Sequence, residues 1–217
     1  MAYRVYLSEF SIEERSNVVL QPIQFWFEFG STYSYLSVMR IERVAKDAGV
    51  PTDWKPFLLG PIFRSQGWDT SPFNIYPAKG RYMWRDIERL CVKYGIPFKK
   101  PTQFPRNGLL AARVACIAAS EGWCSEFTKA VFRVNFAEDR DISDPAIISG
   151  VLESIGRNGI EVIRRAESPE NKESLRNQTQ RAVGLGIFGA PTFVVGDEIF
   201  WGNDRLEDAI DWYKKQM

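Results

Sequence analysis

Two serines follow the first β-type run of the chain, and they are the side chains in its first half best placed for chemistry. Ser31 comes directly after Gly30, where the run stops and a helical pattern begins, and Ser34 lies one turn further on. A hydroxyl at such a position can donate a hydrogen bond to a thiolate or an oxyanion, and the N–H groups of a helix start favour an anion. Serine also caps helices there, so the local sequence leaves both interpretations open.

Two loops in the last part of the chain carry residue types suited to holding a ligand. Gly-Ala-Pro-Thr at 189–192 precedes a β-type run, and Trp-Gly-Asn-Asp-Arg at 201–205 precedes the last helical pattern. Asn203 and Asp204 combine helix-start N–H groups with a carboxylate, which suits a ligand that carries both a carboxylate and an amino group. An ordinary strand start and ordinary capping explain the same residues.

The sequence contains no histidine, which excludes Ser-His-Asp triads, Cys-His pairs and His-ligated metal sites. The three cysteines, Cys91, Cys116 and Cys124, form no Cys-x-x-Cys pair. We therefore expect reduced cysteines, no disulfide framework and no metal site. An enzyme made from this chain must borrow its reactive group or use Ser, Tyr, Lys, Asp or Glu.

The bulk composition limits the partners of the protein. Among 217 residues, 28 Lys and Arg stand against 27 Asp and Glu, so no strong field of one sign recruits nucleic acid or an anionic membrane. No apolar run approaches the roughly 20 residues that span a bilayer. Residues 1–20 carry Glu9, Glu13, Glu14 and Arg15 where an export signal needs an apolar stretch. The sequence thus predicts a cytoplasmic protein.

Apolar spacing predicts the elements that position the three loops. Ile23, Phe25, Phe27 and Phe29 alternate at period two, which predicts a strand that stops at Gly30. A parallel partner strand is expected after an intervening helix, because a βαβ unit requires a crossover connection.

That helix is expected to end at Gly49, and the second strand to lie around residues 54–58. Residues 60–79 are predicted to be mostly loop, because Gly67, Pro72 and Pro77 interrupt any periodicity. Helical patterns then dominate, at 82–94, from Asn107, from Pro145, and from Ser168 to Ala182.

The last part of the chain is predicted to form a hairpin and a helix. Residues 191–195 and 198–201 are β-type runs around a Gly196-Asp197 turn, and a helix follows residues 202–205. The order βαβ, helical block, ββα predicts a single mixed sheet with a helical insertion, a fold of the α/β class.

The three loops, in this order, resemble the 2-hydroxychromene-2-carboxylate isomerases and the kappa-class glutathione transferases, in the DsbA-like branch of the thioredoxin superfamily. The resemblance covers about residues 22–215. It rests on FEFGSTYSYL at 27–36, PAKGRYMWRDIER at 77–89, FPRNGLLAAR at 104–113 and GIFGAPTFVVGDEIFWGNDRL at 186–206.

The resemblance implies a thioredoxin-like fold and a division of the chain. Residues 22–59 and 184–217 would form the thioredoxin-like domain, residues 60–183 an inserted, mostly helical domain, and residues 1–21 an N-terminal extension. Ser31 stands where redox relatives carry their reactive cysteine. A Ser-x-x-Ser sequence lacks the thiolate that dithiol–disulfide exchange needs, so a disulfide oxidoreductase is not expected.

The resemblance also implies roles for individual residues. Ser31 would lie beside the sulfur of bound glutathione as the catalytic residue. Pro191 matches the family's cis-proline, and Ala190 before it would offer backbone hydrogen bonds to the peptide part of glutathione. The γ-glutamyl end would be held by Trp201, Gly202, Asn203 and Asp204, and the substrate cleft would be lined near Arg64, Asn74 and Phe104.

Two departures from the family pattern bear on the substrate. The family often has Ser-Pro-Tyr-Ser where this chain has Ser-Thr-Tyr-Ser at 31–34, which loosens the first helical turn and keeps the hydroxyl. Many relatives have a Gly-Asn pair where Gly67-Trp68 stands here. Aromatic side chains available to line a substrate pocket are Trp26, Tyr33, Trp68 and Phe73.

The function implied is a glutathione-dependent isomerase that acts on a small aromatic substrate of the 2-hydroxychromene-2-carboxylate or benzylidenepyruvate type. One alternative is a transferase or peroxidase of the kappa type, which releases the glutathione adduct. Another is a non-catalytic thioredoxin-like binding protein. The family commonly forms homodimers, so a homodimer is expected.

Overall fold

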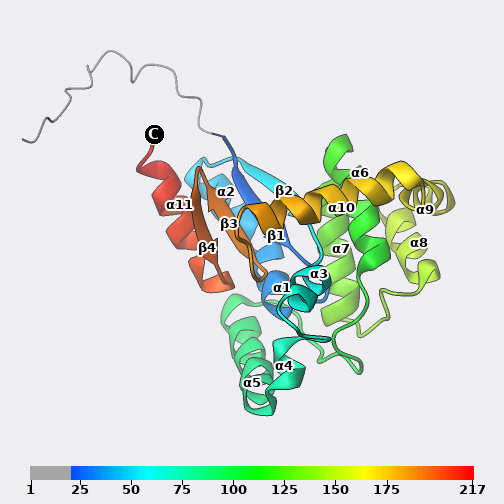
Figure 1. Ribbon diagram of the computed structural model, residues 1–217, viewed down its shortest axis with the longest axis horizontal. Helices are drawn as coiled ribbons and strands as arrows, with labels where there is room; N and C mark the ends of the chain where they lie inside the picture. Colours follow the sequence, from blue (N-terminus) through cyan, green and yellow to red (C-terminus); the bar gives the residue numbers. More distant parts are fainter. Residues whose placement is uncertain (1–20) are drawn as a thin grey trace, which may run out of the picture.

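The computed structural model describes residues 21–217, and residues 1–20 of the predicted extension lie outside them. Within this range the chain forms the predicted mixed sheet, with strand order β2-β1-β3-β4 (Figure 1). β1 pairs in parallel with β2, while β3 is antiparallel to both β1 and β4. The strands are β1 (Ile23–Phe27), β2 (Thr52–Pro56), β3 (Thr192–Val195) and β4 (Glu198–Trp201).

Central strand β1 is buried on both faces. Phe25, Phe27 and, just beyond the strand, Phe29 belong to the large core, as the period-two pattern predicts. Trp26 points to the opposite face, where it is fully buried in a second cluster and meets Phe57 edge-on. The suggestion that Trp26 lines a substrate pocket is therefore wrong, because helices cover both faces of this strand.

The helix after β1 is interrupted once. The sequence pattern predicts one helix up to Gly49, whereas the structure has α1 (Thr32–Val38) and α2 (Ile41–Ala48), separated by Met39 and Arg40. Gly49 ends α2 in the left-handed conformation, as expected for a C-terminal glycine. At the interruption, the side chain of Arg40 turns into the protein and reaches Asn203.

Residues 60–79 are more ordered than the sequence suggests. They contain most of α3 (Leu59–Ser65), all of α4 (Pro72–Ile75) and the start of α5 (Pro77–Tyr94). The prediction of a mostly irregular segment is wrong because both prolines are the first residues of helices, where the missing N–H costs no hydrogen bond.

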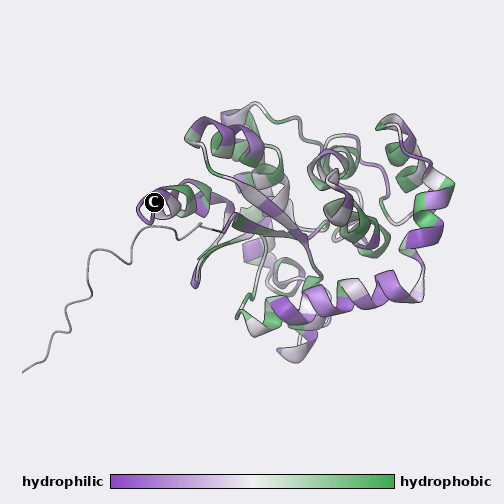
Figure 2. Cartoon of the chain, turned by 90° about the horizontal axis from the view of Figure 1, so that it is seen from above, coloured by the Kyte–Doolittle hydropathy of each residue, from purple (hydrophilic) through white to green (hydrophobic). Residues whose placement is uncertain are grey.

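Five further helices form the block between the two halves of the sheet. Asp144 and Ser168 cap α8 and α10 with their side chains, as the prolines after them predict. α6 and α10 both contact β2, and one continuous core joins the sheet to these helices. α10 crosses in front of the sheet (Figure 1) and is largely hydrophilic (Figure 2). The helices are α6 (Leu109–Glu121), α7 (Cys124–Phe136), α8 (Pro145–Ser154), α9 (Gly159–Ala166) and α10 (Pro169–Gly184).

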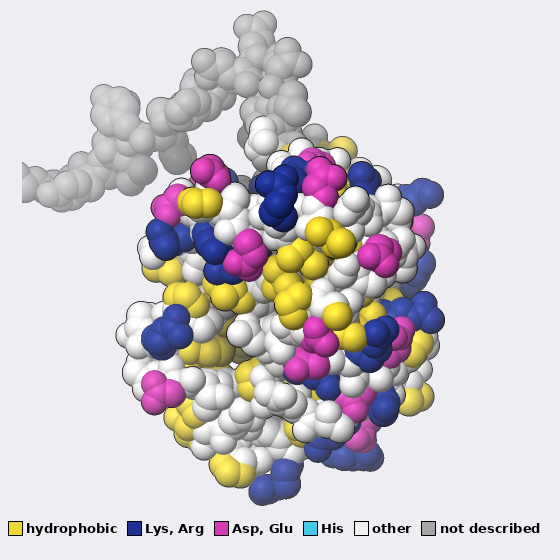
Figure 3. Space-filling model, turned by 90° about the vertical axis from the view of Figure 1, so that its right-hand side faces the viewer, with side chains coloured by type: hydrophobic (Ala, Val, Ile, Leu, Met, Phe, Trp, Pro, Cys, Tyr) yellow, Lys and Arg dark blue, Asp and Glu magenta, His cyan; other side chains and the backbone are white. Residues whose placement is uncertain are grey.

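The chain ends in a short 3-10 helix, η2 (Asn203–Arg205), and in α11 (Leu206–Lys214). α11 is the helix predicted after residues 202–205, and it buries Leu206, Ala209, Ile210 and Tyr213. In the view of Figure 3, positive and negative side chains are mixed over the surface. Across residues 21–217, every helix is too short or too polar to cross a membrane.

Candidate active site

Ser31 lies where the two halves of the sheet meet. It is the N-cap of α1, and its Oγ accepts a hydrogen bond from the Ser34 N–H at 3.1 Å. The same Oγ donates to the carbonyl oxygen of Ala190 at 2.9 Å. The Ser31 side chain therefore caps α1 and also contacts the loop of residues 189–192. Ser34, the other candidate donor, is fully buried and its Oγ has no partner, so a ligand meets Ser31 first.

The two C-terminal loops are joined directly to each other. The Ala190–Pro191 bond is cis, as predicted from the resemblance, and the Gly202 N–H donates to the Pro191 carbonyl oxygen at 3.0 Å. Trp201 covers Gly189 so closely that a Cβ there would lie 2.2 Å from the indole Nε1. Trp201 itself remains 52% exposed. These contacts bring Ala190, Pro191 and Gly202 together beside Ser31.

Asn203 and Asp204 follow in the same loop but face different surroundings. Asn203 is only 3% exposed, and its Oδ1 accepts hydrogen bonds from Ser37 Oγ at 3.2 Å and from Arg40 Nη1 at 3.1 Å. Asp204 is exposed, and its carboxylate lies 3.2 Å from the Arg205 guanidinium. The loop is thus tied to α1 through Asn203, while Asp204 stands at the surface.

Two of the three predicted substrate-cleft residues are brought together. Asn74 Nδ2 donates to the carbonyl oxygen of Phe104 at 3.3 Å and to Thr70 Oγ1 at 3.2 Å. The Phe104 ring packs edge-on against Trp84 at 4.9 Å between centroids. Arg64 lies on the exposed surface of α3, and within the described chain it has no contact that joins it to this pair.

Tyr33 connects this aromatic cluster to the serine loop. It stands two residues after Ser31, and its ring lies 6.2 Å from that of Phe73. Its hydroxyl donates to Asp86 Oδ2 at 3.0 Å, and burial together with that carboxylate raises its pKa. Of the four aromatic residues that the sequence suggests, Tyr33 and Phe73 are thus in contact, whereas Trp68 packs against Phe63.

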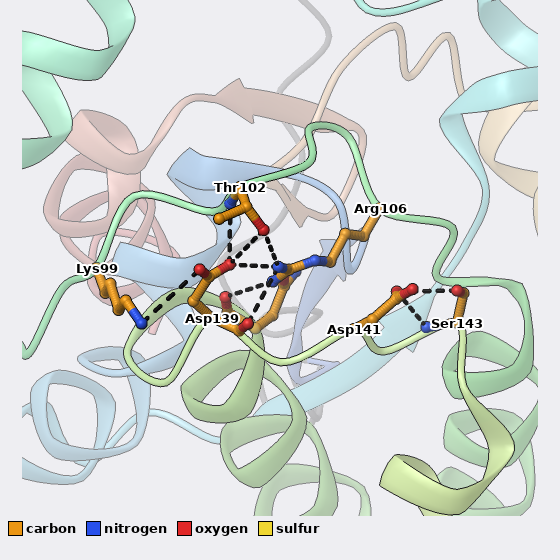
Figure 4. A network of polar contacts seen from close by, with 7 residues as sticks. Lys99, Thr102, Arg106, Asp139, Asp141 and Ser143 are labelled. Carbon is orange, nitrogen blue, oxygen red and sulfur yellow. Dashed lines mark hydrogen bonds and ion pairs between the residues drawn. The ribbon is translucent and has the colours of Figure 1, made fainter.

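A buried polar network, which the sequence analysis missed, holds the segment before Ser31. Arg106 is 5% exposed and donates to both the carbonyl oxygen and the side-chain Oδ1 of Asn135 at 3.0 Å. Arg106 also pairs with Asp139, which accepts from the Thr102 N–H at 2.9 Å (Figure 4). Asn135 Nδ2 in turn donates to the Phe29 carbonyl oxygen at 3.0 Å.

Glu28 is a second residue that the sequence analysis missed. Its carboxyl lies inside the protein at the end of β1, although the residue keeps some exposed surface, and it accepts a hydrogen bond from the Gly30 N–H at 2.9 Å. A Cβ on Gly30 would lie 3.1 Å from this carboxyl and 3.3 Å from the Arg106 carbonyl oxygen. Burial raises the pKa of Glu28 to about 7, and the hydrogen bond only partly opposes this shift.

Comparison with known proteins identifies the family to which this domain belongs. A family model described as a DSBA-like thioredoxin domain matches residues 22–213. The chain belongs to the DSBA-like thioredoxin domain family.

Relatives of this DSBA-like domain include named enzymes of two kinds. The chain is 29% identical over 189 residues to a 2-hydroxychromene-2-carboxylate isomerase of Sphingobium xenophagum, covering 86% of this chain and 95% of that protein. It is 26% identical over 208 residues to glutathione S-transferase kappa 2 of Caenorhabditis elegans, covering 88% and 90%. The family resemblance predicted from the loops is therefore confirmed.

Solved structures agree with this placement. A 2-hydroxychromene-2-carboxylate isomerase structure superposes with a TM-score of 0.79 at 26% identity, covering 90% of this chain and 97% of that chain. A probable DsbA oxidoreductase from Streptomyces coelicolor gives a TM-score of 0.74 at 16% identity, covering 90% and 89%. The second match supports the thioredoxin-like fold alone.

This DSBA-like domain has no reactive thiol at its serine loop. Cys91 and Cys124 are buried and Cys116 is half-buried, and all three are free. Burial raises the pKa of Cys91 to about 11 and that of Cys116 and Cys124 to about 12, so these thiols stay protonated at neutral pH. Between residues 21 and 217, no group of three His, Cys, Asp or Glu side chains is placed to hold a metal ion.

Proposed function

We propose that this protein is a glutathione-dependent isomerase that acts on small aromatic substrates of the 2-hydroxychromene-2-carboxylate or benzylidenepyruvate type. The observation that carries the proposal is the hydrogen bond from Ser31 to Ala190, which places a partly exposed hydroxyl beside the cis-proline loop. The isomerase relatives and the fit to an isomerase structure at 26% identity support the same reaction class.

The residues around Ser31 fit a tripeptide thiol. Ala190 offers a backbone carbonyl oxygen to a peptide N–H, and Asp204 offers an exposed carboxylate to an ammonium group. Kappa-class glutathione transferases among the relatives favour glutathione as the thiol. The protein's own thiols are protonated and none belongs to residues 31–34, so a bound thiol is the nucleophile that this site lacks.

Bound glutathione would supply a thiolate that adds reversibly to the conjugated double bond of the substrate and leaves after rotation about the resulting single bond. Ser31 would turn its one hydroxyl hydrogen from the Ala190 carbonyl oxygen to that thiolate and thereby lower the pKa of the glutathione thiol. The step needs no histidine, in agreement with the composition. The cluster of Asn74, Phe104 and Trp84 would provide a wall of the aromatic substrate pocket.

A kappa-type transferase or peroxidase is the second candidate, since a kappa-class relative matches at 26% identity. Product analysis distinguishes the two functions. An isomerase regenerates glutathione and leaves its concentration unchanged, whereas accumulation of a glutathione conjugate would establish the transferase.

We further propose a cytoplasmic homodimer. The free cysteines favour a reducing compartment, and the family resemblance favours the dimer. Light scattering of the purified chain tests the dimer, with twice the mass of one chain as the expected result and the mass of a single chain as the result against it.

Ultraviolet difference spectroscopy of glutathione binding at neutral pH tests the proposed function. A saturable thiolate absorbance is expected for the wild type. In Ser31→Ala, the pKa of the bound thiol should rise by about 1 to 2 units, because a hydrogen bond to a charged group contributes about 1.5–3 kcal/mol. Absence of glutathione binding in a folded wild-type protein would overturn the proposal and favour a thioredoxin-like binding module.

A further inference from the structure

We propose that Arg40 is a positioning residue that fixes the side-chain amide of Asn203, so that the amide N–H group faces the α-carboxylate at the γ-glutamyl end of glutathione. This inference rests on the proposed function and extends it. It assigns a task to a buried cation that lies outside the loops named so far.

Arg40 is a buried cation with one unsatisfied hydrogen-bond donor. The residue is 7% exposed, and its Nε has no hydrogen-bond partner. Its guanidinium lies 3.8 Å from the centroid of the Tyr94 ring and forms an ion pair with Glu207, whose side chain is 52% exposed. Burying a cation with one donor unsatisfied carries a desolvation cost that an ion pair with a half-exposed carboxylate offsets only in part.

The contact with Asn203 has a defined direction. Arg40 Nη1 lies 3.1 Å from Asn203 Oδ1, and a guanidinium can only donate hydrogen bonds. The side-chain oxygen of Asn203 must therefore face Arg40, where it also accepts from Ser37 Oγ at 3.2 Å. Because the two ends of an amide point apart, Nδ2 is turned away from α1.

That Nδ2 donor is available to a ligand. Within residues 21–217 it has no protein partner, and it is not one of the enclosed unpaired polar atoms of this region, which are Ser34 Oγ, Arg40 Nε and Arg106 Nε. It therefore reaches solvent, although Asn203 as a whole is only 3% exposed. A buried amide whose Nδ2 has no protein partner in the described chain can donate a hydrogen bond to a carboxylate.

The neighbours of Asn203 indicate which carboxylate it takes. Gly202, the preceding residue, is hydrogen-bonded to Pro191, and Ser31 is hydrogen-bonded to Ala190, so the amide lies in the same group of loops as the proposed thiol site. Asp204, the next residue, offers an exposed carboxylate. An amide donor and an exposed carboxylate on consecutive residues of one loop match a group with both a carboxylate and an ammonium, which the γ-glutamyl end supplies.

The replacement Asn203→Asp distinguishes a role of Asn203 in binding glutathione from a purely structural role of this residue. A carboxylate keeps an acceptor for Arg40 and Ser37, so a purely structural role predicts unchanged glutathione binding. In the proposed role the ligand donor becomes a negatively charged oxygen. Isothermal titration calorimetry should then show glutathione bound at least tenfold more weakly, while the midpoint of thermal unfolding stays within about 2 °C, as expected for a change of under 1 kcal/mol.

A modified ligand makes the test sharper. This analogue of glutathione has its γ-glutamyl α-carboxylate converted to an amide. The wild type should bind the analogue more weakly than it binds glutathione, but more tightly than Asn203→Asp binds glutathione. Arg40→Met should bind glutathione several-fold more weakly and discriminate less between the two ligands, because the amide of Asn203 is then free to turn over. Arg40→Lys, which keeps a cation at this position, should recover part of that discrimination.

The outcomes separate the two proposals. Suppose that the wild-type protein binds glutathione and that both Asn203→Asp and Arg40→Met prefer glutathione over its amide as strongly as the wild type does. The role of Arg40 is then overturned, and the proposed function stands. If folded wild-type protein does not bind glutathione, both proposals fail. Should Asn203→Asp not fold, Arg40→Met decides the inference by the same change in ligand preference.

Discussion

The Ser31 hydroxyl and the Ala190 carbonyl oxygen lie 2.9 Å apart, although 159 positions separate the two residues in the sequence. The bond places Ser31 against the backbone that is expected to hold the peptide part of glutathione. Its neighbour in the Ser-x-x-Ser sequence, Ser34, is enclosed and makes no such contact. The two serines are therefore not equivalent, and this difference can be tested with thiols.

Replacing Ser31 with cysteine should trap glutathione. The thiolate introduced by Ser31→Cys would attack oxidised glutathione, form a mixed disulfide and release one reduced glutathione. Because residue 34 remains serine and the native cysteines are buried or half-buried elsewhere, no second thiol resolves the product. Intact-protein mass spectrometry should show one added glutathione per chain, removable by dithiothreitol. Ser34→Cys is the control and should stay unmodified, so equal labelling of both variants would contradict the assigned geometry.

The carboxyl of Glu28 should give the protein a characteristic pH dependence. Its pKa is raised by burial from 4.5 to about 7, so the folded state binds this proton more tightly than the unfolded state. The free energy of unfolding contributed by Glu28 is therefore greatest below pH 4.5, decreases as the pH rises toward 7, and is constant above that. Glu28→Gln should remove this decrease, which amounts to at most about 3 kcal/mol.

Urea unfolding at pH 5 and pH 8 measures this effect. The difference between the two pH values should be smaller in Glu28→Gln than in the wild type, whereas Glu198→Gln on the exposed surface of β4 should behave as the wild type does. An unchanged difference in Glu28→Gln would show that the carboxyl of Glu28 does not titrate in this range.

The Asn135 side chain should contribute substantially to stability. It is 1% exposed, donates to the Phe29 carbonyl oxygen and accepts from Arg106. Asn135→Ala leaves the buried Phe29 carbonyl oxygen without its donor, while Arg106 keeps the main-chain carbonyl oxygen of residue 135 as an acceptor, so the free energy of unfolding should fall by about 1–3 kcal/mol. Asn177→Ala, on the exposed face of α10, should change it by less than about 0.5 kcal/mol. Urea denaturation of the two variants tests this contrast, and similar values would argue against the network.

Gly189 should tolerate no side chain, because Trp201 already occupies the space. A Cβ at residue 189 would lie 2.2 Å from the indole Nε1, whereas nothing lies within 4 Å of the Cβ position at Gly184 in α10. Gly189→Ala should therefore displace the indole, change the tryptophan fluorescence and destabilise the protein by about 1–3 kcal/mol. Gly184→Ala should leave the fluorescence unchanged and stabilise slightly. A wild-type spectrum for Gly189→Ala would contradict the contact.

The sequence predicted the elements whose signals are local. The alternation of Phe25 and Phe27 is enough to predict β1, and a proline behind Asp144 or Ser168 marks a helix start. The prediction for residues 60–79 is wrong because Pro72 and Pro77, which interrupt the periodicity, each open a helix. Proline lacks a backbone N–H at every position. At the first residue of a helix this N–H would have no acceptor within the helix, so the residues after the proline determine whether a helix begins there.

The loops of the candidate site were predictable, but the residues that hold them were not. Ser31, Pro191 and Asn203 belong to loops with recognisable sequence patterns. Arg40, Arg106 and Glu28 have ordinary charged surroundings in the sequence, and only the fold shows that they point inward. Their partners are distant in the chain, as with Arg40 and Asn203, which are 163 positions apart. A local pattern contains no information about such a partner.

The pairing of Trp26 in β1 with Thr192 in β3 has a consequence for the synthesis of the protein. During translation, β1 and β2 and the helices that follow leave the ribosome long before β3 exists. The central strand must therefore wait with one edge unpaired until nearly the whole chain has been made. Contacts over such separations form slowly, so we expect the nascent chain to depend on chaperones during this interval and to complete the proposed glutathione site only after its release.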